Sequence, residues 1–206
     1  MKYILKRDEP QSFTDWKNLA NEDWKPTYDK LSGKEKKDVK NALIDEQGGI
    51  CCYCERVLEY NDSHIEHLNA QCNSEEERLD FNNMLCSCQQ QLKKSEPLHC
   101  GNSKGDKALL ITPLNSDCQE KFTYTEDGQI GYTDSASKDT IDILQLNIDK
   151  LNSLRESIID TFVYLDPNTK DELLSREDRK IYVEKYLEKK DNRYEPFHTT
   201  IKYLFS

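Results

Sequence analysis

The feature that most constrains this chain is a set of closely spaced cysteines near its middle. Cys51 and Cys54 have C-x-x-C spacing, which lets two thiolates reach one metal ion at about 2.3 Å from each sulfur. A tetrahedral zinc site needs two further ligands. Cys100 stands before a glycine in a turn-like setting and supplies one, and Cys88 is the preferred fourth ligand. The spacing therefore predicts a small unit stapled by a structural zinc ion.

The sequence leaves the identity of the fourth zinc ligand open. Cys86 lies two residues before Cys88, and His99 is a reserve ligand. Ordinary buried thiols and a redox C-x-x-C pair are the alternatives to zinc. A redox pair normally opens a helix in a βαβ unit, whereas a glycine pair precedes this one, which fits a zinc knuckle better. The other cysteines are interpreted as structural or incidental: Cys52, Cys72 and Cys118.

Between the cysteine groups lies the run Ser-His-Ile-Glu-His-Leu at residues 63–68. Adjacent residues of a strand point to opposite faces, so Glu66 can bind a metal ion while His67 meets a water molecule. The carboxylate suits Mg²⁺ or Mn²⁺, and an imidazole with an ordinary pKa of about 6.5 suits proton abstraction at neutral pH. Asn83 can orient the histidine or coordinate the metal. Together these residues predict one-metal phosphodiester hydrolysis.

Two nearby residues carry more than one interpretation. His64 can assist the site, bind metal or support the strand, and Lys104 is either a phosphate contact or a solvated lysine. The H-x-E formed by His64 and Glu66 also matches zinc deaminases. Those sites need P-C-x-x-C downstream, and here C-x-x-C lies upstream. The order of the motifs therefore favours a nuclease over a deaminase.

Composition limits the class of protein. The 206 residues are 35% hydrophobic and 33% charged, and they fit one domain with elaborations or one large and one small unit. A net charge of −10 argues against a general nucleic-acid coat, but a bound divalent cation reverses the local field where a phosphate sits. The charged start and the lack of a run of roughly 20 apolar residues argue against a signal peptide and a membrane span. We therefore expect a cytoplasmic protein with reduced thiols.

The periodicity of the chain predicts an α+β fold in three segments. Residues 1–47 form an N-terminal helical segment, and residues 48–108 form the zinc-stapled core. Residues 109–206 form a hairpin that turns at Gly128, followed by C-terminal helices.

Local signals mark where several helices begin. Ser32 and Glu35 have the spacing of a capping box. Asn147 and Ser175 are expected to cap two later helices, and Pro196 suits the first turn of the last one.

Four motifs resemble those of the HNH endonucleases: C-x-Y-C-E, I-E-H, N-M-L-C-S-C and H-C-G-N-S-K-G-D. The pattern is most similar to the HNH nuclease subunits of Septu-type anti-phage defence systems, including forms that accompany retrons. The resemblance covers most of the chain and implies a ββα-metal core within a mainly helical chain. It implies that His67 is the general base, Glu66 a metal ligand and Asn83 the asparagine of the motif. By the same resemblance Asn102 is the candidate for the last motif position, because Gly101 stands where relatives often carry asparagine.

The resemblance also implies a function. The chain would be an effector nuclease with structural Zn²⁺ and catalytic Mg²⁺ or Mn²⁺, cleaving DNA or structured RNA such as tRNA. Its implied partners are an ABC/SMC-like ATPase and, in retron forms, a reverse transcriptase with its msDNA. The alternative is a zinc-stapled, non-catalytic adaptor that binds a partner through its helices. Metal-dependent cleavage by the assembled complex distinguishes the two.

Overall fold

The computed structural model describes residues 1–69, 75–92 and 94–206, so Cys72 lies outside the described residues. The chain is an α+β protein, as predicted, whereas the more specific ββα-metal assignment stays a prediction. Among the described residues no helix is both long and apolar enough to cross a membrane. The helices are α1 (Gln11–Lys17), α2 (Gly33–Glu46), α3 (Glu75–Arg78), α4 (Gly101–Lys104), α5 (Ser135–Leu144), α6 (Asp149–Val163), α7 (Arg176–Leu187) and α8 (His198–Phe205). The strands are β1 (Ser63–His67), β2 (Met84–Cys88), β3 (Phe122–Tyr124) and β4 (Ile130–Tyr132).

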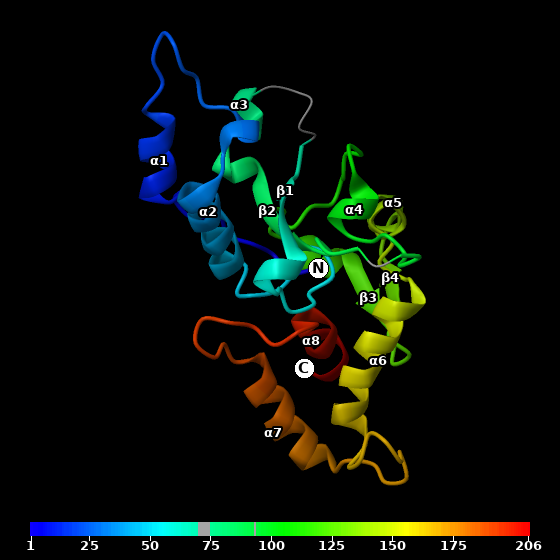
Figure 1. Ribbon diagram of the computed structural model, residues 1–206. Helices are drawn as coiled ribbons and strands as arrows, with labels where there is room; N and C mark the ends of the chain where they lie inside the picture. Colours follow the sequence, from blue (N-terminus) through cyan, green and yellow to red (C-terminus); the bar gives the residue numbers. More distant parts are fainter. Residues whose placement is uncertain (70–74, 93) are drawn as a thin grey trace.

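The strands pair in two separate antiparallel sheets. β1 pairs with β2 in a register that sets His67 opposite Met84, and the short helix α4 lies beside this sheet (Figure 1). β3 and β4 form the predicted hairpin. Its turn residue Gly128 has φ +78, and a Cβ there would lie 2.2 Å from the backbone oxygen of Asn152. Glycine is therefore required where the hairpin meets α6.

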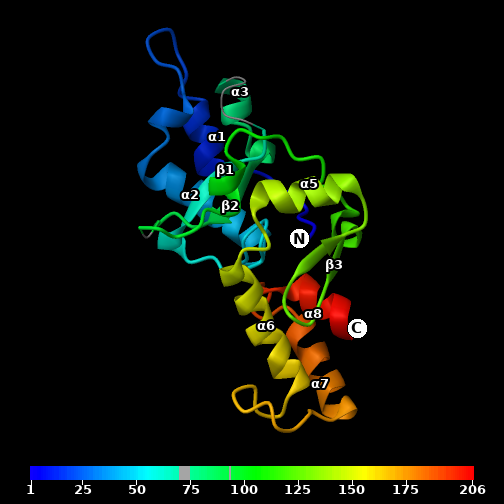
Figure 2. The same cartoon turned by 90° about the vertical axis from the view of Figure 1, so that its right-hand side faces the viewer.

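One hydrophobic core joins the three predicted segments. Phe13 and Val39 from the first segment share a buried cluster with the cysteines of the second and with Phe122 and Leu144 of the third. A smaller cluster lies where α6, α7 and α8 meet, formed by Ile159, Phe162, Val183 and Ile201. Figures 1 and 2 both show α6 and α7 extending away from the sheets. The division into residues 1–47, 48–108 and 109–206 stays an organisational proposal.

The two serines that were predicted to cap helices behave differently in the structure. The Ser175 hydroxyl accepts the Asp178 N–H at 3.1 Å before α7, as predicted. Ser32 does precede α2, but its side chain makes no capping hydrogen bond, so the expected capping box with Glu35 is wrong. Gly33 has φ +57, a left-handed conformation that departs from the helical start a capping box requires.

Tertiary contacts explain the other differences. The amide of Asn147 pairs with both the N–H and the C=O of Ile130, each at 2.8 Å. This side chain therefore extends the edge of β4 and does not cap α6, which begins after Ile148. The last helix begins at His198, two residues beyond the predicted Pro196.

Glu55 joins the cysteine turn to Met1 and to α8. Its buried carboxylate lies 3.0 Å from the Met1 amine and accepts the Thr199 N–H at 2.8 Å. Burial by itself would raise the pKa of Glu55, but the Met1 ammonium and the Thr199 donors outweigh burial and hold it below its ordinary value. The ionised carboxylate therefore fastens α8 to the turn that carries Cys51 and Cys54.

Arg155 generates a stability prediction. It is 1% exposed on α6, and its guanidinium donates to the backbone oxygens of Gly128 at 2.5 Å and Leu146 at 2.6 Å. We predict that Arg155→Ala lowers the free energy of unfolding by about 3 kcal/mol or more, because buried acceptors lose charged donors. Urea unfolding measures the loss. Leu154→Ala, on the neighbouring position that is 38% exposed, is the matched control and should cost less than about 1 kcal/mol; equal losses would contradict the anchoring role.

Candidate metal centre and active site

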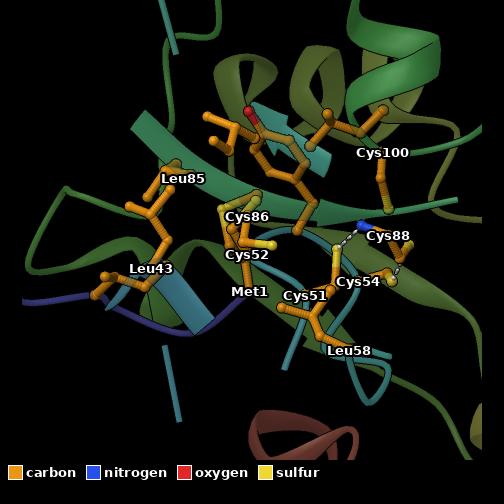
Figure 3. Packing of buried hydrophobic residues seen from close by; sticks show 14 of the residues in the cluster. Met1, Leu43, Cys51, Cys52, Cys54, Leu58, Leu85, Cys86, Cys88 and Cys100 are labelled. Atoms are coloured by element: carbon orange, nitrogen blue, oxygen red, sulfur yellow. Dashed lines mark hydrogen bonds between the residues drawn. The ribbon is translucent and has the colours of Figure 1, made fainter. Parts of the chain in front are cut away.

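Four cysteine sulfurs meet beside the first sheet. Cys51 and Cys54 come from the turn before β1, Cys88 ends β2 and Cys100 immediately precedes α4. Their Sγ atoms all lie within 4.8 Å of one another and all four residues are buried (Figure 3). The sulfurs of Cys54 and Cys88 are 3.7 Å apart, and sulfurs bound tetrahedrally to one zinc stand about 3.8 Å apart. These thiols can hold a zinc ion, and they are the four that the spacing selected.

The four-sulfur group includes neither of the two alternative ligands, although His99 lies against it, with Nδ1 3.9 Å from the Cys88 sulfur. Figure 3 places Cys86 beside Cys52 and apart from the four sulfurs, and burial raises the pKa of the Cys86 thiol to about 12. His99 is buried, with Nδ1 3.1 Å from the Cys100 sulfur. Burial lowers its pKa to about 4, so the imidazole is neutral and can support that sulfur as a hydrogen-bond donor.

Arg56 balances the charge of the cysteine cluster. A zinc ion with four thiolates carries a net charge of about −2, which is costly to bury without a counter-charge. Burial opposes the charge on the guanidinium, but the Cys88, Cys54 and Cys51 sulfurs outweigh it and raise the pKa of Arg56. The donor set, its burial and this neighbouring cation all fit a structural zinc ion.

The two oxygens of Glu66 have different neighbours. Glu66 is buried on β1. Its Oε1 accepts the Tyr53 hydroxyl at 3.1 Å and lies 3.2 Å from the Lys104 ammonium. Its Oε2 lies 3.6 Å from His64 Nε2, because residues two apart share one face of a strand. One oxygen is therefore fixed by the protein while the other faces His64.

Lys104 has a structural position that the sequence did not indicate. Its side chain is 1% exposed, and the ammonium donates to the backbone oxygens of His67 at 2.9 Å and Gly105 at 3.1 Å. The prediction of a solvated lysine is therefore wrong, and the phosphate contact stays a prediction. The ammonium holds the Glu66 carboxylate and the adjacent backbone in place.

Gly101 borders a small pocket beside this carboxylate. A Cβ at Gly101 would lie 2.4 Å from Glu66 Oε2 and 2.8 Å from His64 Nε2. The pocket has a volume of about 230 Å³, and its lining includes His64, Glu66, His67, Gly101, Asn102 and Asp106. A carboxylate oxygen of this kind suits Mg²⁺ or Mn²⁺, and an imidazole can complete the coordination of a divalent ion. The donors that face the space beside Gly101 therefore fit a cation.

His67 lies next to Glu66 but has its own contacts. Its Nε2 is 3.0 Å from the Arg78 carbonyl oxygen, and the Tyr28 ring packs edge-on at a centroid distance of 4.5 Å. Burial lowers the pKa of His67, an effect that the Arg78 hydrogen bond partly offsets. Since a carbonyl only accepts, Nε2 donates the proton, and the neutral ring carries its lone pair on Nδ1. That tautomer is the form a general base requires.

The two asparagines of the predicted site lie in different places. The Asn83 Oδ1 accepts the Asn69 N–H at 2.8 Å, and its Nδ2 donates to the Glu77 carbonyl at 3.0 Å. Asn83 therefore ties together the described ends of the connection between β1 and β2, and its role toward His67 or a metal stays a prediction. Asn102 lines the pocket and donates to the Gln89 carbonyl.

Sequence reasoning missed several residues around the pocket, and for Lys104 it missed the contact with Glu66. Tyr53 and Lys104 hold Glu66, Asp106 lines the pocket and Tyr28 contacts His67. Tyr53 lies inside the C-x-x-C pair, and Asp106 ends the last of the quoted motifs, so both had a local signal. Tyr28 had none, because its approach to His67 depends on the packing of a distant segment.

The fold and site define a small α+β protein in which a four-cysteine cluster supports a carboxylate–histidine pocket. No family model matches the chain. Its sequence is 32% identical over 148 residues to the "Retron Vc95 putative HNH endonuclease" of Vibrio cholerae serotype O1 biovar El Tor, an alignment that covers 66% of this chain and 70% of the relative. The chain therefore belongs to the HNH endonuclease family.

The cysteine cluster generates a metal prediction. Cys100→Ser replaces one of four thiol ligands, so we expect zinc content to fall well below one ion per chain. Loss of a structural metal belongs to the mutations that cost upward of about 4 kcal/mol, or roughly 8–16 °C in melting temperature for a chain of this size. Atomic absorption and calorimetry measure both quantities. Cys118→Ser, at a buried cysteine outside the cluster, is the control and should keep its zinc; zinc loss in both variants would count against a site at Cys100.

Gly101 generates a second prediction. Gly101→Ala places a methyl against Glu66 Oε2 and His64 Nε2, so we expect Mn²⁺ binding at the pocket to weaken at least tenfold, measured by electron paramagnetic resonance. Zinc content should stay at the wild-type level, because the methyl meets none of the cysteine sulfurs among its nearest atoms. Unchanged Mn²⁺ binding would show that the cation does not sit beside Gly101.

Proposed function

We propose that this chain is a metal-dependent endonuclease in which Glu66 and His67 carry the chemistry of phosphodiester hydrolysis. The observation that carries the proposal is the space beside Gly101, where Glu66 Oε2 and His64 Nε2 converge. His67, the next residue along β1, lines the same pocket. Kinship with the relative named "Retron Vc95 putative HNH endonuclease" supports this assignment.

Glu66 and His64 would hold the divalent cation, with Asn102 and Asp106 in the lining of the same pocket. When bound, Mg²⁺ or Mn²⁺ supplies stabilisation of the charge that develops on the phosphate and the leaving oxygen. Tyr53 and the Lys104 ammonium keep Oε1 occupied, which fixes the direction of Oε2. This preorganisation lowers the reorganisation that the site must undergo during reaction.

His67 would act as the general base. Its Nδ1 takes a proton from the attacking water, and the Arg78 carbonyl accepts the hydrogen bond from Nε2 both before and after that transfer. The carbonyl dipole favours the imidazolium that results. The ring contact with Tyr28 restricts rotation of the imidazole.

The substrate would be DNA or structured RNA such as tRNA, because the chemistry at this pocket addresses the phosphate and not the base. We propose an ABC/SMC-like ATPase as the partner that holds the nuclease in check within an anti-phage defence complex. In a retron form, a reverse transcriptase and its msDNA would belong to the same complex. The net charge of −10 and the retron-associated relative support a partner that supplies much of the grip on nucleic acid.

We predict that His67→Ala lowers the rate of metal-dependent cleavage by roughly 10²–10⁴-fold, the usual contribution of a general base. Glu66→Gln, which keeps the size of the side chain and removes its charge, should lower the rate to a similar extent by weakening cation binding. The assay follows cleavage of plasmid DNA and tRNA with Mg²⁺ or Mn²⁺ by the chain co-purified with its proposed ATPase partner.

Zinc content is the control for these two variants and should match the wild type. The melting temperature is expected to fall in both, because His67 packs on Tyr28 and Glu66 is the carboxylate partner of the buried Lys104 ammonium, so the assay is run below both melting temperatures. Wild-type rates in His67→Ala would contradict the base assignment. A complex that binds its partner tightly and cleaves neither nucleic acid, with or without these changes, would favour the non-catalytic adaptor.

A further inference from the structure

A second hollow adjoins the pocket beside Gly101. It has a volume of about 350 Å³ and shares a wall with that pocket formed by His64, Ile65 and Asn102. A volume near 300 Å³ or more is typical of sites that enclose a ligand group. The two spaces are therefore neighbours on one surface, and a polymer that reaches the first can extend into the second.

The second hollow is basic although the chain is acidic. Lys36 and Lys40, one turn apart on α2, belong to its lining, together with Tyr28, Ser63 and Gln90. We call this site the basic hollow. Among its described lining residues there is no carboxylate. Residues 25–40 hold six lysines against three acidic residues, in a chain whose net charge is −10, and two of these lysines, Lys36 and Lys40, bring positive charge next to the proposed active site.

The Lys40 ammonium is held in place by the protein. It donates to the backbone oxygens of Tyr60 and Ser63 and lies 4.3 Å from the centroid of the Tyr60 ring. These contacts use two of its three N–H donors. A cation fixed in this way loses little conformational entropy when it meets an anion.

Lys36 and Tyr28 connect the basic hollow to the proposed base. The Lys36 side chain is exposed, and its ammonium lies 5.4 Å from the centroid of the Tyr28 ring. The same ring packs against His67 at 4.5 Å. The cationic wall therefore leads directly to the residue proposed to activate water.

We propose that the basic hollow binds the phosphodiester backbone of the substrate on one side of the bond that is cut. Lys36 and Lys40 would contact backbone phosphates, and the amides of Gln90 and Asn102 would supply neutral donors, since lysine and amide side chains are common phosphate and sugar contacts. The inference rests on the proposed nuclease function and adds to it the surface along which the strand runs. DNA and RNA share this chemistry, and the probes below separate them.

The test compares two lysines of the same helix. Lys36→Gln removes a charge from the basic hollow, and Lys37→Gln removes one from an exposed position outside it. Both changes are made in the zinc-loaded full chain carrying His67→Ala and co-purified with its proposed ATPase partner, so that the probes stay intact and the whole complex is tested. Fluorescence anisotropy then measures binding of a single-stranded DNA, its duplex and an RNA hairpin across a range of salt concentrations.

We expect Lys36→Gln to weaken binding of the preferred probe roughly three- to tenfold and to reduce the slope of log K against log salt by about 0.7–0.9, the value for one lost phosphate contact. Lys37→Gln should stay within about twofold of the parent chain. The probe with the largest Lys36 effect identifies the substrate class. Equal effects of the two changes, or no binding of any probe by the parent chain, would overturn the inference.

The same variants with His67 restored separate this inference from the proposed function. Cleavage that is wild-type in Lys36→Gln rejects the basic hollow and leaves the nuclease assignment standing. Specific loss of binding in Lys36→Gln, with no cleavage by the wild-type complex, retains the hollow as a binding site and rejects the nuclease assignment.

Discussion

The convergence of four sulfurs on one point is the constraint on which the rest of the site depends. It brings together a turn, the end of β2 and the residue before α4, which are separated by up to 49 positions of sequence, from Cys51 to Cys100. Cys100 has φ +55, a conformation that costs a non-glycine residue of order 1–3 kcal/mol. Ligation at this position would offset that cost. Ligation would also fix Gly101, whose N–H donates to the Ser87 hydroxyl at 3.1 Å. Gly101 in turn lines the adjacent pocket.

The charges around the site are balanced locally. The total charge of the chain gives little indication of them. Arg56 faces the cysteine sulfurs, Lys104 faces Glu66, and the lysines of α2 lie on the side of the proposed substrate. Each cation lies close to the group or ligand that it would stabilise. Net charge therefore describes the outer surface of this protein, and it does not describe the electrostatics of the pocket.

The features that could be predicted from sequence are those with short, rigid spacing. The C-x-x-C pair, the selection of Cys88 over Cys86 and the alternation of Glu66 and His67 follow from the geometry of turns and strands, and the structure has the four sulfurs and the strand as expected. The α+β class and the hairpin at Gly128 were predicted on the same basis. The roles of His64, Glu66, His67, Asn83 and Asn102 stay predictions.

Features that depend on tertiary packing could not be predicted. Asn147 has the local signal of a helix cap, but the open edge at Ile130 takes its amide. Lysine is usually a surface residue, and Lys104 is buried only because α4 packs beside β1. Tyr28 reaches His67 through the packing of the N-terminal segment. In each case a partner that is remote in sequence outweighs the local preference.

The buried ammonium of Lys104 has a consequence for the proposed cation site. A divalent ion that approaches Glu66 meets a carboxylate already neutralised at 3.2 Å, so its electrostatic attraction is smaller than an unpaired carboxylate would provide. A cation at the proposed site would therefore depend on its other ligands for affinity more than it would beside an unpaired carboxylate. The negative charge of a phosphate group bound next to it would add to that affinity.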